Sequence, residues 1–159
     1  MKYLPVLLLL AIPFYSFGQK YVTTEGEFMD TTDNRNDKCI DANLYYYQIG
    51  CKYPKSSSTL LIEVQKYMQG SKIVSTESGY ITFRARIDCE GHPVKKVQVL
   101  QTDEQYKKFH FDKAYVNELY LYFVTLDNWK TISSYKGSFY YTAFITFKIR
   151  NGKVINITP

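Results

Sequence analysis

Residues 80–88 read Tyr-Ile-Thr-Phe-Arg-Ala-Arg-Ile-Asp, and this stretch decides the fold. Its apolar side chains stand at every second position, namely Ile81, Phe83, Ala85 and Ile87. Such alternation is typical of a β-strand with one buried face. Residues 89–93, Cys-Glu-Gly-His-Pro, are turn-forming types, and residues 94–101 alternate again. The pattern therefore predicts a β-hairpin over residues 80–101.

A second alternating stretch lies near the C-terminus, over residues 139–150. One face carries Tyr141, Ala143, Ile145, Phe147 and Ile149. Asn151-Gly152 is a tight-turn signal, after which residues 153–158 should fold back as a short last strand. A two-residue turn would pair Ile149 with Val154 and place Ile155 and Ile157 on the opposite face of the sheet. That second face also carries Tyr80, Tyr140 and Phe144. Either the first helix and residues 45–47 cover it, or it is exposed as a contact surface.

Two amphipathic helices accompany these strands. Ser56, Ser57 and Ser58 are N-cap candidates for the first helix, which Gly70 should end. Its apolar stripe is Leu60, Leu61, Val64, Tyr67 and Met68. Asp112 should cap the second helix, whose stripe is Val116, Leu119, Phe123, Leu126 and Trp129. The expected fold is α+β over residues 43–159. An antiparallel sheet of three to four strands carries two helices, in the order helix, hairpin, helix, strand, short final strand.

The first 42 residues differ from the rest. Residues 1–18 are typical of a signal peptide, with Lys2 before a short apolar run and small residues at Ser16 and Gly18. Cleavage is expected before Gln19. The apolar run is shorter than the roughly 20 residues that span a bilayer, and no later run is long enough. Residues 19–42 are polar and acidic, which predicts a flexible arm.

These features predict an exported protein without a membrane span after cleavage, in the periplasm or outside the cell. The chain has 159 residues, of which 45% are hydrophobic, enough for a single folded domain. Its net charge of +5 comes from scattered basic residues and gives little reason to expect an anionic partner. The basic and aromatic run at residues 106–111 resembles single-strand nucleic-acid surfaces. An exported protein seldom meets such ligands, so no nucleic-acid partner is predicted.

Export to an oxidising compartment permits one disulfide among Cys39, Cys51 and Cys89. Spacing alone leaves all three pairings open. We favour Cys51 with Cys89, because that bond would tie the N-terminal segment to the sheet.

Catalytic motifs are few. The sequence contains no G-x-G, H-E-x-x-H or G-x-S-x-G pattern. Asp88, Cys89 and His92 adjoin one another at the hairpin turn, and they motivate an alternative hypothesis of a small secreted enzyme. Polar residues are also what a turn requires without any chemistry. We therefore predict a protein that is not an enzyme, with no catalytic residue, metal ligand or cofactor.

An ordered series of residues resembles the C-terminal domain of TonB energy transducers. The matching segments are Tyr53-Pro54 and residues 79–83, 87–88, 91, 94–100, 111–112, 129–130, 137 and 145–149. The resemblance covers residues 53–159. It implies a strand-strand-helix-strand α+β fold without catalysis. It also implies that a short peptide of an outer-membrane receptor is bound as an added strand beside the last long strand.

The chain also departs from that family. A cleavable signal replaces the inner-membrane anchor, no Pro/Lys-rich linker follows it, and Thr131 succeeds Lys130 where the family has proline. An accessory binding role is therefore expected, with a periplasmic protein or a TonB-dependent outer-membrane receptor as partner. The resemblance puts the peptide-binding edge strand at Tyr140, Tyr141, Thr142, Ala143, Phe144, Ile145, Thr146 and Phe147. A self-associating structural protein, such as a homodimer joined through the second sheet face, is the remaining alternative.

Overall fold

The structure is a computed structural model that describes residues 27–30, 32 and 34–159. The predicted signal peptide over residues 1–18, its cleavage before Gln19 and the first part of the predicted arm lie outside the described residues. Among the described residues, no helix combines the length and apolar character needed to cross a membrane.

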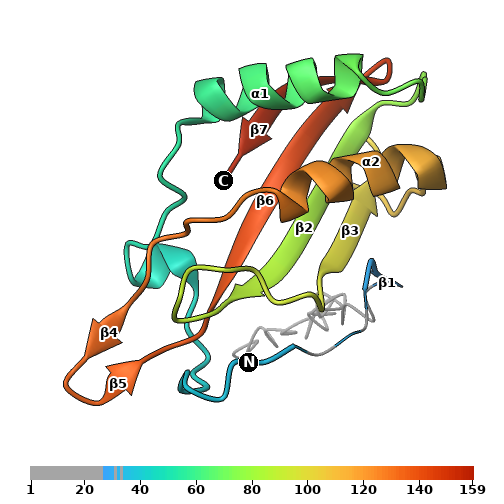
Figure 1. Ribbon diagram of the computed structural model, residues 1–159. Helices are drawn as coiled ribbons and strands as arrows, with labels where there is room; N and C mark the ends of the chain where they lie inside the picture. The colour runs from blue at the N-terminus through green and yellow to red at the C-terminus, as the bar shows by residue number, and fades with distance from the viewer. Residues whose placement is uncertain (1–26, 31, 33) are drawn as a thin grey trace, which may run out of the picture.

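A five-stranded antiparallel sheet carries two α-helices on one face (Figure 1). The strand order is β1-β3-β2-β6-β7, and β4 and β5 form a separate small hairpin. The predicted α+β class is confirmed, with more strands than the three to four expected. The elements are β1 Glu27–Phe28, η1 Tyr46–Gln48, α1 Ser57–Gln69, β2 Gly79–Ile87, β3 Gln98–Thr102, α2 Lys113–Val124, β4 Ser133–Ser134, β5 Gly137–Ser138, β6 Tyr141–Arg150 and β7 Lys153–Thr158.

The predicted helix starts are confirmed. The Ser56 hydroxyl accepts a hydrogen bond from the Thr59 N–H at 3.2 Å, which caps α1. One carboxylate oxygen of Asp112 accepts from the N–H groups of Ala114 and Tyr115 at 2.9 and 3.1 Å, which caps α2. These bonds satisfy main-chain donors that have no partner within a helix.

The core lies between the sheet and the helices. β2 pairs with β6 over nine residue pairs, from Gly79 with Ile149 to Ile87 with Tyr141. Because side chains alternate along a strand, the odd-numbered residues of both strands point toward the helices. Phe83 packs against Phe123 of α2 and Phe147 of β6, with ring centroids 5.4 and 5.8 Å apart.

A bulge changes the expected faces of β7. Ile149 pairs with Val154 as predicted, but Lys148 pairs with Asn156, so Ile155 is an extra residue in β7. Ile157 therefore pairs with Phe147 and is fully buried in the core, whereas Ile155 remains 36% exposed. The prediction that Ile157 lies on the second face is wrong, because one inserted residue moves all later side chains to the other face.

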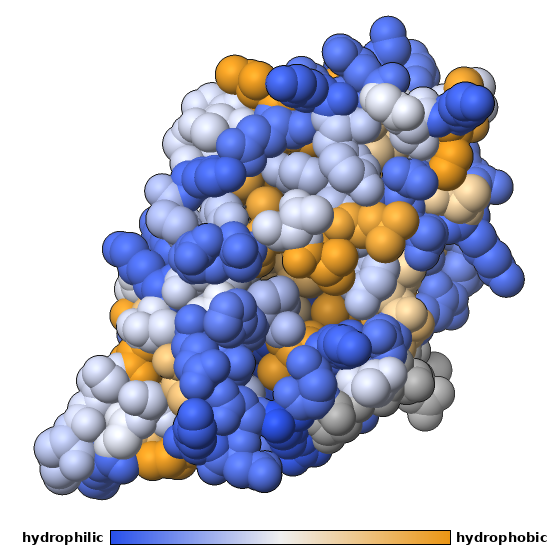
Figure 2. Space-filling view, viewed as in Figure 1, coloured by the Kyte–Doolittle hydropathy of each residue, from blue (hydrophilic) through white to orange (hydrophobic). Residues whose placement is uncertain are grey.

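The second face of the sheet is covered only in part. Tyr45 and Tyr46 pack on Phe144, with ring centroids 6.0 and 6.2 Å away. The first helix does not contribute to this cover, since α1 lies on the opposite face with α2 (Figure 1). On the helical side, apolar surface gathers over α2 (Figure 2), where Leu121 and Val124 are exposed.

The predicted pairing of Cys51 with Cys89 is wrong. The disulfide joins Cys39 to Cys89, whose Cα atoms are 5.5 Å apart. Residues 40–45 run beside the start of β6 and so bring Cys39 to the end of β2. Cys51 is buried, with its sulfur 4.0 Å from the Thr131 carbonyl, and burial raises the pKa of its thiol.

The described part of the predicted flexible arm packs against the sheet. β1 pairs with β3, placing Glu27 opposite Val99 and Phe28 opposite Gln98. The disulfide at Cys39 is a second attachment. The described residues between 27 and 42 are thus attached to the sheet at two places, through β1 and through Cys39.

Candidate peptide-binding edge

β6 carries the predicted binding residues from Tyr141 to Phe147, and Tyr140 directly precedes it, but β6 is an inner strand of the sheet. Its C-terminal half pairs with β7, so that Thr146 lies opposite Thr158 and Phe147 opposite Ile157. The outer side of this half is therefore already hydrogen-bonded by the chain's own last strand. The expectation of an open edge fails here, because the tight turn at Asn151-Gly152 returns the chain along β6.

The N-terminal half of β6 extends beyond β7, and residues 40–45 lie beside it in parallel (Figure 1). The Ile40 N–H donates to the Ser138 carbonyl at 2.9 Å, and the Tyr140 N–H donates to the Ile40 carbonyl at 3.0 Å. The Thr142 N–H donates to the Leu44 carbonyl at 2.7 Å. An extended segment of the protein thus occupies the place where the sequence predicts a bound peptide.

Phe144 lies between these two covered stretches. Main-chain groups alternate sides along a strand, so Phe144 directs its N–H and C=O outward, as Thr142 does. The ladder with β7 begins at Thr146, and the described bonds of residues 40–45 end at Thr142. Within the described residues, neither extends to the main chain of Phe144. This position is a gap in the hydrogen bonding along the outer side of β6.

The eight predicted site residues divide between the two faces of the sheet. Four point into the core and are buried, namely Tyr141, Ala143, Ile145 and Phe147. The Tyr141 hydroxyl donates to the Lys130 carbonyl at 2.7 Å, and burial raises its pKa. Tyr140 is also buried, and its hydroxyl donates to the Asn36 carbonyl at 3.0 Å. On the second face, Tyr140 is buried, and Thr142, Phe144 and Thr146 present partly exposed side chains.

Asp41 and Arg86 hold the segment to the sheet, and sequence reasoning missed both. The Arg86 guanidinium donates to the two carboxylate oxygens of Asp41 at 2.6 and 3.0 Å. This pair of hydrogen bonds holds the pKa of the Asp41 carboxyl below its usual value. The two residues are 45 positions apart, so no local pattern indicates the contact.

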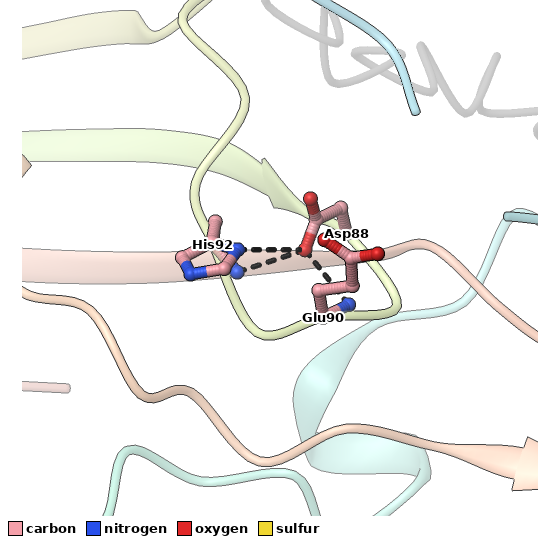
Figure 3. Close-up of side chains that lie close together, drawn as sticks. All are labelled: Asp88, Glu90 and His92. Carbon is pink, nitrogen blue, oxygen red and sulfur yellow. Dashed lines mark hydrogen bonds and ion pairs between the residues drawn. The ribbon is translucent and has the colours of Figure 1, made fainter. Parts of the chain in front are cut away.

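The hairpin turn brings Asp88, Glu90 and His92 together (Figure 3). One Asp88 carboxylate oxygen accepts from the main-chain N–H groups of Glu90 and His92 at 2.9 and 2.8 Å. The His92 Nδ1 lies 3.8 Å from the same oxygen. The three side chains could offer ligand atoms to a metal ion within 4.8 Å of one another. The two main-chain hydrogen bonds to Asp88 show that its carboxylate stabilises the turn.

The alternative enzyme hypothesis rests on the adjacency of Asp88, Cys89 and His92, which could activate a thiol or bind a metal ion. The Cys89 sulfur is bonded to Cys39, so the Asp88, Cys89 and His92 grouping has no thiol nucleophile in this structure. The remaining thiol, Cys51, is buried in the core and has a raised pKa.

Comparison of the chain with protein-family models, with curated proteins and with solved structures gives no match.

Proposed function

We propose that the protein is a non-catalytic exported binding module, similar to the TonB C-terminal domain, that takes up an extended peptide on the outer side of β6. The ordered residues over 53–159 and the α+β element order support this proposal. The disulfide is in keeping with an oxidising compartment. The partner would be a periplasmic or outer-membrane protein, such as a TonB-dependent receptor, and the role accessory to transport.

One observation carries the proposal: the outer side of β6 already accepts an extended chain. Residues 40–45 lie beside residues 138–142 as a parallel segment with three main-chain hydrogen bonds, of which the bond from Thr142 to Leu44 is on β6 itself. A main-chain hydrogen bond contributes about 1 kcal/mol net, so this segment is held weakly by its backbone alone. A longer peptide in the same position could form a more continuous ladder.

Displacement of residues 40–45 would expose the main-chain groups that such a peptide needs. When residues 40–45 leave, the outward N–H and C=O groups of Tyr140 and Thr142 join those of Phe144 as free partners. Tyr45 and Tyr46 leave the Phe144 ring at the same time, which uncovers an aromatic surface for an apolar side chain of the peptide. Backbone pairing would supply affinity, and Thr142 and Phe144 would read alternate side chains.

The test is the binding of labelled synthetic peptides, taken from the periplasmic ends of outer-membrane receptors, measured by fluorescence polarisation. Thr142→Pro removes an outward N–H and leaves the β2 side of the strand intact, so it should weaken binding at least about tenfold. Asp41→Ala with Tyr45→Ala should strengthen binding, because the competing segment loses its ion pair and its ring contact. Thr82→Ala, on the same face but away from this edge, is the matched control.

Circular dichroism must show that each variant is folded. Equal affinity of the folded Thr142→Pro variant and the unsubstituted protein would overturn strand addition at β6. An increase in molecular mass with concentration, without peptide binding, would instead favour the self-associating alternative.

A further inference from the structure

The face of the sheet opposite the helices carries a hollow of about 320 Å³. Arg84 and Arg86 of β2 line it, because their neighbours along the strand, Phe83, Ala85 and Ile87, point into the core. The rings of Phe28 and Tyr140 also line this hollow.

Four cationic side chains line the hollow, namely Arg35, Arg84, Arg86 and Lys96. No Asp or Glu of the described chain is among its lining residues. Asp41 nearby pairs with Arg86, and its carboxylate also lies 4.0 Å from the Arg35 guanidinium. The Asp41 carboxylate is thus close to both Arg35 and Arg86.

Among the described residues, the hydrogen-bond and ring partners of Arg84 and Lys96 are neutral groups. The Arg84 guanidinium donates to the Gln98 side-chain carbonyl at 3.2 Å and lies 5.9 Å from the Phe144 ring centroid. The Lys96 ammonium lies 5.6 Å from the Phe28 ring centroid. Neither makes an ion pair with a described residue.

Arg84 and Lys96 line the same hollow. Gln98 lies directly opposite Arg84, and Lys96 precedes Gln98 by two residues. Arg84 and Arg86 are also two residues apart, so they share one face of β2 at a separation of roughly 7 Å. Arg86 is paired with Asp41, whereas Arg84 and Lys96 line the same hollow without an ion pair to a described residue. Like charges on one small surface repel, and an anion between Arg84 and Lys96 would relieve the repulsion.

We propose that this hollow is a binding site for a small oxyanion, a carboxylate or phosphate group held by Arg84 and Lys96 beside the Arg86–Asp41 pair. A guanidinium matches the geometry of both groups with paired N–H donors. Asp41 on Arg86 is an example of this recognition within the same surface. The site goes beyond the proposed peptide binding, since neither cation belongs to the outer side of β6.

The experiment is a calorimetric titration of the full folded chain with inorganic phosphate, pyrophosphate and citrate, at one low ionic strength. At least one anion should bind saturably. Arg84→Gln and Lys96→Gln should each weaken its affinity about tenfold, as expected for the loss of a charged hydrogen bond. Lys153→Gln removes an exposed lysine on β7 and is the control, expected to leave the affinity unchanged.

Binding of citrate alone would assign the site to carboxylates, and binding of the phosphates alone would assign it to phosphates. The absence of saturable binding by all three anions would overturn the proposal, as would equal weakening by Lys153→Gln. Lys96 is exposed, so its variant keeps the test valid if Arg84→Gln does not fold. Tyr45→Ala changes the peptide edge but not the lining of the hollow, so it should bind the anion normally, which separates this site from the peptide edge.

Discussion

Replacing Cys39 and Cys89 by serine should lower the free energy of unfolding by about 4 kcal/mol. The bond closes a loop between residues separated by 50 positions. For a loop of that size, the chain-entropy relation gives a loss of roughly 14 cal/mol/K from the unfolded state, which is about 4 kcal/mol at 25 °C. A domain of this size is stable by roughly 5–15 kcal/mol, so the loss should be a large fraction of the total.

Urea denaturation followed by tryptophan fluorescence measures this change. Trp129 is the chain's single tryptophan and is buried against Tyr53, with ring centroids 4.7 Å apart, so its emission should report unfolding. The double variant should unfold at lower urea with a similar slope. Cys51→Ser is the control for a lost thiol outside any disulfide.

Two results would refute this reasoning. A stability change below about 1 kcal/mol would mean that the bond does not restrict the unfolded chain as the loop length implies. Peptide mapping that found Cys51 in the disulfide would contradict the pairing itself. In the native protein, a thiol reagent should modify Cys51 only after unfolding, because its side chain is buried.

Two further predictions concern helix capping and pH. Asp112→Ala should lower the free energy of unfolding by about 1 kcal/mol in the same denaturation assay, because two N–H groups of α2 lose their acceptor, whereas Asp112→Asn should lose less. The buried Tyr115 hydroxyl donates to the Gly152 carbonyl at 3.0 Å, and burial raises its pKa to about 12. Tyrosine in the unfolded chain ionises near pH 10, so stability should fall between pH 10 and 12, and Tyr115→Phe should reduce that fall.

Local signals in the sequence account for most of the secondary structure. Alternating apolar residues predict β2 and β6, and Ser56 and Asp112 predict the helix starts. These predictions succeed because each signal depends only on neighbours within a few residues. The prediction that β6 is the binding strand rests on a resemblance to a known family. The alternation in β6 does not indicate which segment lies beside it.

What the sequence left open depends on contacts between distant residues. Cys39 meets Cys89 only because residues 40–45 run along the start of β6. Apolar residues do alternate there, at Ile40, Ala42 and Leu44, but alternation does not indicate which strand a segment lies beside. The bulge at Ile155 is equally hidden, since the two-residue turn predicts a regular register. Burial of Ile157 in the core favours the inserted residue, and such packing is visible only in three dimensions.

The disulfide also bears on how a peptide would compete for β6. Cys39 adjoins Ile40, so a displaced segment would remain tethered within a few residues of the strand. A tethered competitor acts at a high effective concentration, in the millimolar range for short flexible links. Peptide affinity in the unsubstituted protein should therefore be lower than the strand itself could provide. The segment also stays joined to the fold through η1, so Cys39→Ser with Cys89→Ser removes one of its two attachments and should raise peptide affinity. Removing the outward donor by Thr142→Pro should lower it. If the tether variant, still folded, bound peptide no better than the unsubstituted protein, residues 40–45 would not be the competitor that this reasoning requires.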